Sequence, residues 1–167
     1  IQRRDAVLVQ LQQPPDAAAA AARLGHDAGR LVVLDGVPRD DALLGYADVV
    51  RADATEAGAW LGVPPADFGP AARERLAKGP SLIALEVPGG NLAVWADGEL
   101  LVPLTGEPVV DTTGGGDAFV AALTASLLRG ESYPEAARRA GAASGATVGH
   151  PGGRPDLRRL RPDPPPQ

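Results

Sequence analysis

The sequence predicts a three-layer α/β fold, in which a mostly parallel sheet is flanked by helices and carries an antiparallel hairpin at one edge. Short apolar runs alternate with helical segments along the chain, which is typical of strand–helix–strand units. The leading runs are almost wholly apolar, as expected for parallel strands that are buried on both faces. Residues 96–99 (Ala-Asp-Gly-Glu) separate two further apolar segments and form a hairpin signal.

Six strands are expected, each from a short run of apolar or β-branched residues bounded by Gly, Pro or charged residues. They cover residues 6–11, 31–35, 47–51, 81–85, 92–95 and 100–104. Asp35 ends the second of these strands, and Asp53 follows the third. Ligands of open α/β sheets bind beyond the carboxyl ends of the strands, so both carboxylates are candidate site residues.

Helices are expected where Pro, Asp and Gly mark the two ends of an apolar or alanine-rich segment. They cover residues 14 to 25 or 29, a helical turn at 41–45, and 55–61, 67–78, 117–129 and 134–147. The first is rich in alanine, and the third and fourth helices are separated by Gly62-Val-Pro-Pro65. This order places a helical segment between consecutive parallel strands, as the fold class requires.

The composition indicates one domain and excludes several classes of function. The 167 residues are 44% apolar, which suffices for a single core, and we expect a domain over residues 1–160 with a Pro-rich tail over 161–167. The net charge is -5, and only residues 154–161 are locally basic, which argues against binding nucleic acid. No run suits a membrane span or a secretory signal, and the absence of cysteine excludes thiolate sites. We therefore expect a cytoplasmic protein with small-molecule partners.

The most informative stretch is residues 109–123, Val-Val-Asp-Thr-Thr-Gly-Gly-Gly-Asp-Ala-Phe-Val-Ala-Ala-Leu. Val109 and Val110 are expected to end a strand-like segment, and Asp117 to open an apolar helix. Glycines at a helix N-terminus let backbone N–H groups converge on an anion, and the helix dipole adds positive potential there. A carboxylate at that point can accept a proton from a nucleophile that attacks the anion. The stretch therefore indicates a phosphoryl-transfer site.

Two simpler interpretations compete with a phosphoryl-transfer site. A run of three glycines is often a flexible connector, and Asp is a common N-cap of helices. The ordered flanks disfavour a connector, and a cap alone would not require Asp111, Thr112 and Thr113 in front of Asp117. A Walker A loop is excluded, because no Gly-Lys-Ser/Thr follows the glycines.

The stretch Asp111-Thr-Thr-Gly-Gly-Gly-Asp117-Ala-Phe closely resembles the C-terminal signature of the ribokinase-like (PfkB) family of carbohydrate and nucleoside kinases. Only Gly115, in place of the usual Ala, departs from that signature. The resemblance implies a ribokinase-like fold and the transfer of the γ-phosphoryl group of ATP, with Mg²⁺, to a hydroxyl of a sugar or nucleoside.

The resemblance also implies individual roles for these residues. It implies Asp117 as the catalytic base and an anion hole formed by the backbone N–H groups of Gly114, Gly115, Gly116 and Asp117. Thr112 is expected on the nucleotide side. In members that bind a monovalent cation such as K⁺, the positions that match Asp111 and Thr113 supply ligands.

Asp35-Gly-Val-Pro-Arg39 resembles the Asp-x-Asn-x-Arg element of the sugar kinases in this family. The resemblance implies that Asp35 and Arg39 contact the substrate, although Val37 replaces the usual Asn. A strand-end Asp followed by a surface Arg is an equally good interpretation.

Asp53-Ala-Thr-Glu56 lies where the family has Asn-x-x-Glu, a motif that organises metal-bound water and phosphate. The resemblance implies that Asp53 and Glu56 lie on the nucleotide side, with Glu56 holding Mg²⁺ through water. Two carboxylates repel a phosphate unless cations neutralise them. The alternative interpretation is a helix N-cap followed by a first-turn acid.

The remaining nucleotide motifs of the family are eroded in this chain. Only Gly90 survives from the Thr-x-Gly-x-x-Gly element, and His150 stands at an arginine position of a later motif. We expect both residues on the nucleotide side, with an ordinary loop histidine as the alternative for His150. Gly141 stands where an Asn usually lies beside the adenine.

The resemblance covers only the C-terminal half of the family, and the chain contains no methionine, so we expect a fragment or a reduced protein. Three hypotheses stay open: an active carbohydrate kinase, a non-catalytic member of the same fold that only binds ligands, and an unrelated α/β domain with a glycine-rich anion loop. A homodimer is one option for its assembly. The residues that select the substrate lie largely in the half that is not matched.

Overall fold

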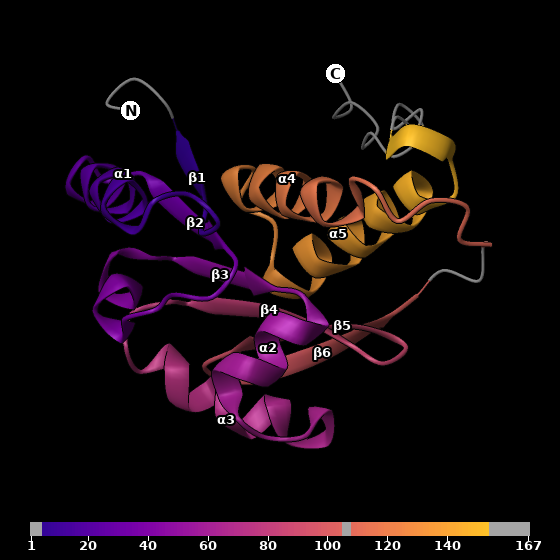
Figure 1. Cartoon of the computed structure of the whole chain (residues 1–167), viewed down its shortest axis with the longest axis horizontal. Helices are drawn as coiled ribbons and strands as arrows, with labels where there is room; N and C mark the ends of the chain where they lie inside the picture. The colour runs from indigo at the N-terminus through magenta and orange to yellow at the C-terminus, as the bar shows by residue number, and fades with distance from the viewer. Residues whose placement is uncertain (1–4, 105–107, 154–167) are drawn as a thin grey trace.

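The computed structural model describes residues 5–104 and 108–153, which include a six-stranded sheet with the order β1-β2-β3-β4-β5-β6 (Figure 1). The strands are β1 (Ala6–Gln10), β2 (Leu31–Asp35), β3 (Val49–Ala52), β4 (Leu82–Val87), β5 (Gly90–Trp95) and β6 (Gly98–Pro103). The first four are parallel, and β5 and β6 add an antiparallel hairpin. The predicted fold class is confirmed.

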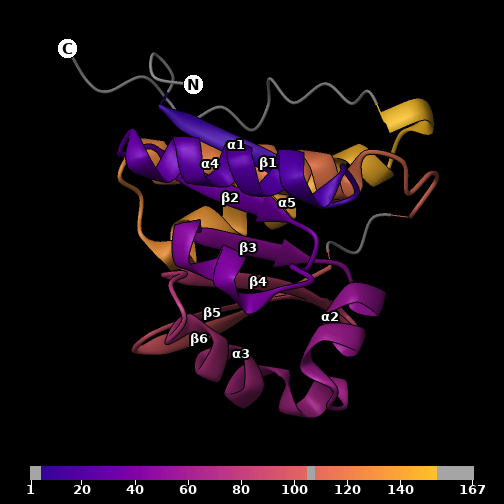
Figure 2. The same cartoon turned by 60° about the vertical axis from the view of Figure 1, so that its left-hand side comes forward.

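Helices cover both faces of the sheet, so the molecule has three layers (Figures 1 and 2). One face packs against α1 (Pro15–Asp27), α2 (Ala54–Leu61) and α3 (Phe68–Leu76). The other face packs against α4 (Gly115–Leu128) and α5 (Tyr133–Val148). Three short 3₁₀ helices complete the described part: η1 (Asp41–Tyr46), η2 (Pro65–Asp67) and η3 (Pro151–Gly153).

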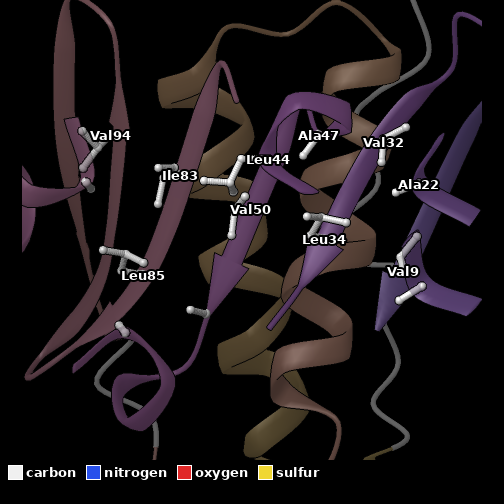
Figure 3. Packing of buried hydrophobic residues seen from close by; sticks show 14 of the residues in the cluster. Val9, Ala22, Val32, Leu34, Leu44, Ala47, Val50, Ile83, Leu85 and Val94 are labelled. Atoms are coloured by element: carbon white, nitrogen blue, oxygen red, sulfur yellow. The ribbon is translucent and has the colours of Figure 1, made fainter. Parts of the chain in front are cut away.

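Successive residues of the central strands serve two separate cores. Leu34, Val50 and Ile83 lie in the core beneath α1, α2 and α3, and Figure 3 shows these side chains on neighbouring strands. Val33 and Val49 lie in the other core, with Phe119 of α4. Because side chains alternate between the two faces of a strand, each strand must be apolar at consecutive positions to fill both cores. This explains the unbroken apolar runs in the sequence.

The prediction that Val109 and Val110 end a strand was wrong. Both residues lie outside the sheet, and each is 60% exposed. The backbone N–H groups of Val110 and Asp111 donate to the carbonyl of Val148, at the end of α5, at 2.8 and 3.0 Å. The segment is therefore held by a helix end, whose last carbonyls lack partners within the helix.

Several element boundaries differ from the prediction by one or two residues. The third strand begins at Val49, and the carboxylate of the preceding residue, Asp48, accepts a hydrogen bond from the N–H of Val32 in β2 at 2.7 Å. The first helix ends at Asp27, between the two predicted ends at Gly25 and Gly29. The helix expected at Asp117 begins two residues earlier, at Gly115.

The predicted Pro-rich tail and the basic segment at 154–161 lie outside the described residues. In residues 5–104 and 108–153, no helix has the length and apolar character that crossing a membrane requires.

Candidate active site

Three polar side chains lie in one row across the carboxyl ends of β1, β2 and β3. The strand register pairs Gln10 with Asp35, and Asp35 with Arg51. Asp35 and Arg51 follow Val33 and Val49 by two positions, so they share the face of the sheet that α4 and α5 cover. The strands thus bring Gln10, Asp35 and Arg51 together beneath α4.

Arg51 is the positive centre of this row. Its Nη1 lies 3.3 Å from Oδ1 of Asp35, and its Nη2 lies 3.6 Å from Oε2 of Glu86. The side chains of Arg51 and Asp35 are only 13% and 10% exposed. A charge at such burial requires a partner, and each of these two residues supplies it for the other.

Gln10 joins the row to the predicted base. Its Nε2 atom donates hydrogen bonds to Oδ2 of Asp35 at 3.0 Å and to Oδ1 of Asp117 at 3.3 Å. Asp117 lies in the first turn of α4, and its side chain is exposed at the carboxyl ends of the strands. The structure therefore brings together Asp35 and Asp117, which lie 82 residues apart in the chain.

The glycine loop forms the N-terminus of α4 and lies against Arg51. Gly114 is the N-cap and has a left-handed backbone conformation with φ of 75°, which residues other than glycine rarely adopt. A Cβ atom added to Gly116 would lie 2.9 Å from Nη1 of Arg51. The guanidinium group therefore touches the backbone of the predicted anion hole.

Several backbone donors of this loop are available to a ligand. Among the described residues, none accepts a hydrogen bond from the N–H groups of Gly114, Gly116 or Asp117, whereas the N–H of Gly115 donates to the carbonyl of Thr112 at 3.3 Å. Free N–H groups at a helix N-terminus, together with the helix dipole and a nearby guanidinium, favour the binding of an anion. The arrangement is suited to a phosphate group.

Gly115 has a packing role that the sequence did not reveal. A Cβ atom at this position would lie 2.7 Å from Cγ1 of Val148, so the first turn of α4 lies directly on the end of α5. This contact gives a reason for glycine at the position where the chain departs from the usual signature.

Asp111 ties the glycine loop to η3. Its Oδ1 accepts a hydrogen bond from the N–H of Thr113 at 2.9 Å, and its Oδ2 accepts one from the N–H of Gly152 at 2.8 Å. The Thr113 hydroxyl and these two N–H groups lower the pKa of Asp111 to about 2. The carboxylate is therefore ionised at neutral pH.

Carboxylate and hydroxyl oxygens such as those of Asp111 and Thr113 are of the ligand type that hard cations prefer. Within the described residues there is no group of three or more His, Cys, Asp and Glu side chains that could hold a metal ion. A cation bound near Asp111 and Thr113 would therefore take most of its ligands from backbone oxygens and water.

Asp53 and Glu56 form a capping box at the start of α2, so the helix-cap interpretation is confirmed. Oδ1 of Asp53 accepts from the N–H of Glu56 at 2.8 Å, and Oε2 of Glu56 accepts from the N–H of Asp53 at 3.0 Å. The other oxygen of Glu56 accepts from Nε2 of Gln12 at 3.2 Å. With its oxygens engaged in this way, Glu56 suits contact with a cation through water rather than directly.

The other predicted site residues lie apart from the row. Arg39 lines a cavity of about 250 Å³ between α1 and η1. Gly90 packs against β6, where an added Cβ would lie 2.2 Å from the carbonyl oxygen of Val102. His150 and Thr112 are both exposed, and Nδ1 of His150 lies 3.0 Å from the carbonyl oxygen of Ala146. In the part of the chain that the structure describes, no hydrogen bond or ion pair joins Arg39, Gly90 or His150 to the row.

Sequence reasoning missed Gln10 and Arg51. The available signal was a polar residue near the carboxyl end of an apolar run, as in Val49-Val-Arg-Ala52. That signal becomes meaningful only once the register shows that the two side chains lie on the same face as Asp35.

Known proteins resemble this chain in both sequence and fold. The profile of the family described as "pfkB family carbohydrate kinase" matches residues 1–159. Bifunctional protein HldE of Caulobacter sp. (strain K31) is 32% identical over 136 residues, which cover 77% of this chain and 28% of that protein. Ribokinase of Arabidopsis thaliana is 29% identical over 162 residues, which cover 90% of this chain and 42% of that protein.

The solved structure of Arabidopsis thaliana ribokinase complexed with ribose and ATP superposes with a TM-score of 0.85 at 24% identity. The match covers 95% of this chain and 55% of that structure. At this level of identity the likeness shows the fold. The chain spans about half the length of that ribokinase structure and less than half of the two curated relatives.

Proposed function

Because this chain belongs to the pfkB family of carbohydrate kinases, we propose that it forms the phosphoryl-transfer half of a kinase that phosphorylates a sugar or sugar-like hydroxyl with ATP. The observation that carries the proposal is the meeting of Asp117 and the free N–H groups of the α4 N-terminus with the polar row of β1, β2 and β3. The complex of Arabidopsis thaliana ribokinase with ribose and ATP supports this pair of substrates.

Asp117 acts as the general base. Its Oδ1 accepts a hydrogen bond from Gln10, and its Oδ2, which has no hydrogen bond among the described residues, can accept the proton of the attacking hydroxyl. The alkoxide oxygen then attacks the γ-phosphorus of ATP in line with the bond to the leaving oxygen of ADP. General-base catalysis contributes about 10²–10⁴-fold to such a rate.

The loop and Arg51 stabilise negative charge on the transferred phosphoryl group. The N–H groups of Gly114, Gly116 and Asp117 lie at a helix N-terminus without an acceptor among the described residues, and the guanidinium lies beside Gly116. Preformed donors of this kind need no rearrangement during the reaction, and phosphoryl transfer depends mainly on positioning and electrostatics. The N–H of Gly115 completes the hole once it leaves the carbonyl of Thr112.

Cations complete the proposed site. Mg²⁺, when bound with ATP, neutralises phosphate charge, and Glu56 would hold it through water because its oxygens serve the helix cap and Gln12. Asp111 and Thr113 would hold K⁺ beside the loop. Thr112, Asp53, Gly90 and His150 are assigned to the nucleotide side.

On the substrate side, we assign Arg39 a direct contact with the sugar. Asp35 contributes to the substrate side indirectly, through its hydrogen bonds with Arg51 and Gln10.

A non-catalytic member of the same fold is the second candidate. The capping box occupies both carboxylates of the Asp53–Glu56 motif, and the packing of Gly90 against β6 explains that glycine without a nucleotide. A protein of this kind would bind ATP or a sugar without turnover.

The test is a screen of ATP consumption by the complete protein that contains this chain. Pentoses, hexoses, keto-sugar acids and nucleosides are offered with Mg²⁺, with and without K⁺. We expect turnover with at least one acceptor, none without Mg²⁺, and a higher rate with K⁺. Binding of ATP without turnover of any acceptor would instead favour the non-catalytic candidate.

A further inference from the structure

We propose that Gln10 is a positioning residue that holds the carboxylate of Asp117 in the orientation required of the base; this inference rests on the proposed function. The amide of Gln10 lies at the carboxyl end of β1, between two carboxylates that belong to β2 and α4. Through its hydrogen bond to Asp117, Gln10 links the row of strand residues to the side chain of the proposed base.

Both N–H groups of the Gln10 amide are used in this bridge. One donates to Oδ2 of Asp35 at 3.0 Å and the other to Oδ1 of Asp117 at 3.3 Å. A neutral amide with two donors can serve two carboxylates at once, which neither a carboxylate nor a hydrocarbon side chain can do. The bridge therefore fixes one oxygen of Asp117 and leaves the other for the substrate.

The far side of the bridge is itself held in place. Asp35 accepts from Arg51 through Oδ1 at 3.3 Å, so both of its oxygens have donors. Arg51 is nearly buried and lies against Gly116, the residue before Asp117. The path from Arg51 through Asp35 and Gln10 thus begins and ends on the first turn of α4. Base and anion loop are set by one buried ion pair, which is the kind of support that a catalytic side chain needs.

Two glutamines that follow Gln10 in the sequence take no part in this bridge. Gln12 donates to Glu56 and lies on the nucleotide side of the proposed site. The side chain of Gln13 is exposed and forms no hydrogen bond within the described residues. Gln13→Leu therefore makes the same chemical change as Gln10→Leu without touching the bridge.

The experiment compares steady-state kinetics of the complete protein, of Gln10→Leu and of Gln13→Leu. We expect Gln10→Leu to lower kcat by about tenfold to a hundredfold, since a misoriented catalytic group costs about that factor. The KM values for ATP and for the acceptor should stay within about twofold, because the bridge contacts neither, and Gln13→Leu should match the wild type. In an Asp117→Asn background, Gln10→Leu should cause no further loss.

A kcat for Gln10→Leu within twofold of the wild type would overturn the proposal, as would an equal loss in the Asp117→Asn background. A wild type without turnover would contradict the proposed function instead. The bridge is then tested by NMR: the side-chain amide resonances of Gln10 should move in Asp117→Asn and stay in place in Asp97→Asn. Unmoved resonances in both variants would refute the bridge itself.

Discussion

At the scale of single residues, the candidate site is built on a nearly buried ion pair. Arg51 interrupts an otherwise apolar strand, and the sheet tolerates its charge because Asp35 and Glu86 lie within 3.3 and 3.6 Å of the guanidinium. The same guanidinium lies against Gly116. Arg51 therefore contributes both to the stability of the sheet and to the positive charge beside the glycine loop.

Removing Arg51 should destabilise the fold. Arg51→Met leaves the carboxylate of Asp35 without its counter-ion, and breaking a buried pair from one side costs up to about 3–5 kcal/mol. We expect a loss of about 2–4 kcal/mol in the free energy of unfolding in urea, because the pair keeps some exposure to water.

The matched control for this variant is Arg73→Met, which breaks the ion pair between Arg73 and Glu99. The side chains of these two residues are 43% and 49% exposed. The loss in Arg73→Met should stay below about 1 kcal/mol. Adding Asp35→Asn to Arg51→Met should restore part of the stability. Equal losses in Arg51→Met and Arg73→Met would show that the pair is not significant for the fold.

At the scale of elements, the close approach of α5 to its neighbours depends on small residues. Gly115 of α4 lies on Val148, and Gly141 of α5 lies on Val102 of β6. A Cβ atom at Gly141 would lie 2.6 Å from Cγ1 of Val102. The helix pair that carries the candidate base is therefore packed without space for an added methyl group at either contact.

Gly141→Ala should consequently destabilise the protein, although alanine favours helices. Overpacking of this kind costs about 1–3 kcal/mol, which exceeds the gain of about 0.5–1 kcal/mol from helix propensity. Gly58→Ala, in α2, is the control, since no atom lies within 4 Å of an added Cβ there. Thermal unfolding should show a lower Tm for Gly141→Ala and a raised Tm for Gly58→Ala. A raised Tm in both would contradict the packing account.

The sequence allowed the elements to be predicted better than their contacts. The fold class and the glycine loop followed from apolar runs, glycines and the ordered signature around Asp117. The strand at Val109 and Val110 was wrong because an apolar pair does not reveal whether it meets a sheet or a helix end. Gln10 and Arg51 were missed because local pattern does not give the strand register that places them beside Asp35.

At the scale of the whole molecule, the parallel order of the strands assembles the site. Gln10, Asp35, Arg51 and Glu86 come from four consecutive strands, and Asp117 reaches them from α4, which covers this face of the sheet. Strands of one direction end at one edge, and ligands of such sheets bind there. The proposed reaction thus follows from topology as much as from any single motif.

The most direct test of the central claim is the rate of γ-phosphoryl transfer from ATP in Asp117→Asn, measured in the complete protein with the best acceptor from the screen. Asparagine keeps the shape of the side chain and an oxygen that Gln10 can contact, but it cannot act as a base at neutral pH. We predict a fall in kcat of at least about 100-fold, with the Kd for ATP within about twofold of the wild type. Turnover close to the wild-type rate would contradict the assignment of Asp117 as the base.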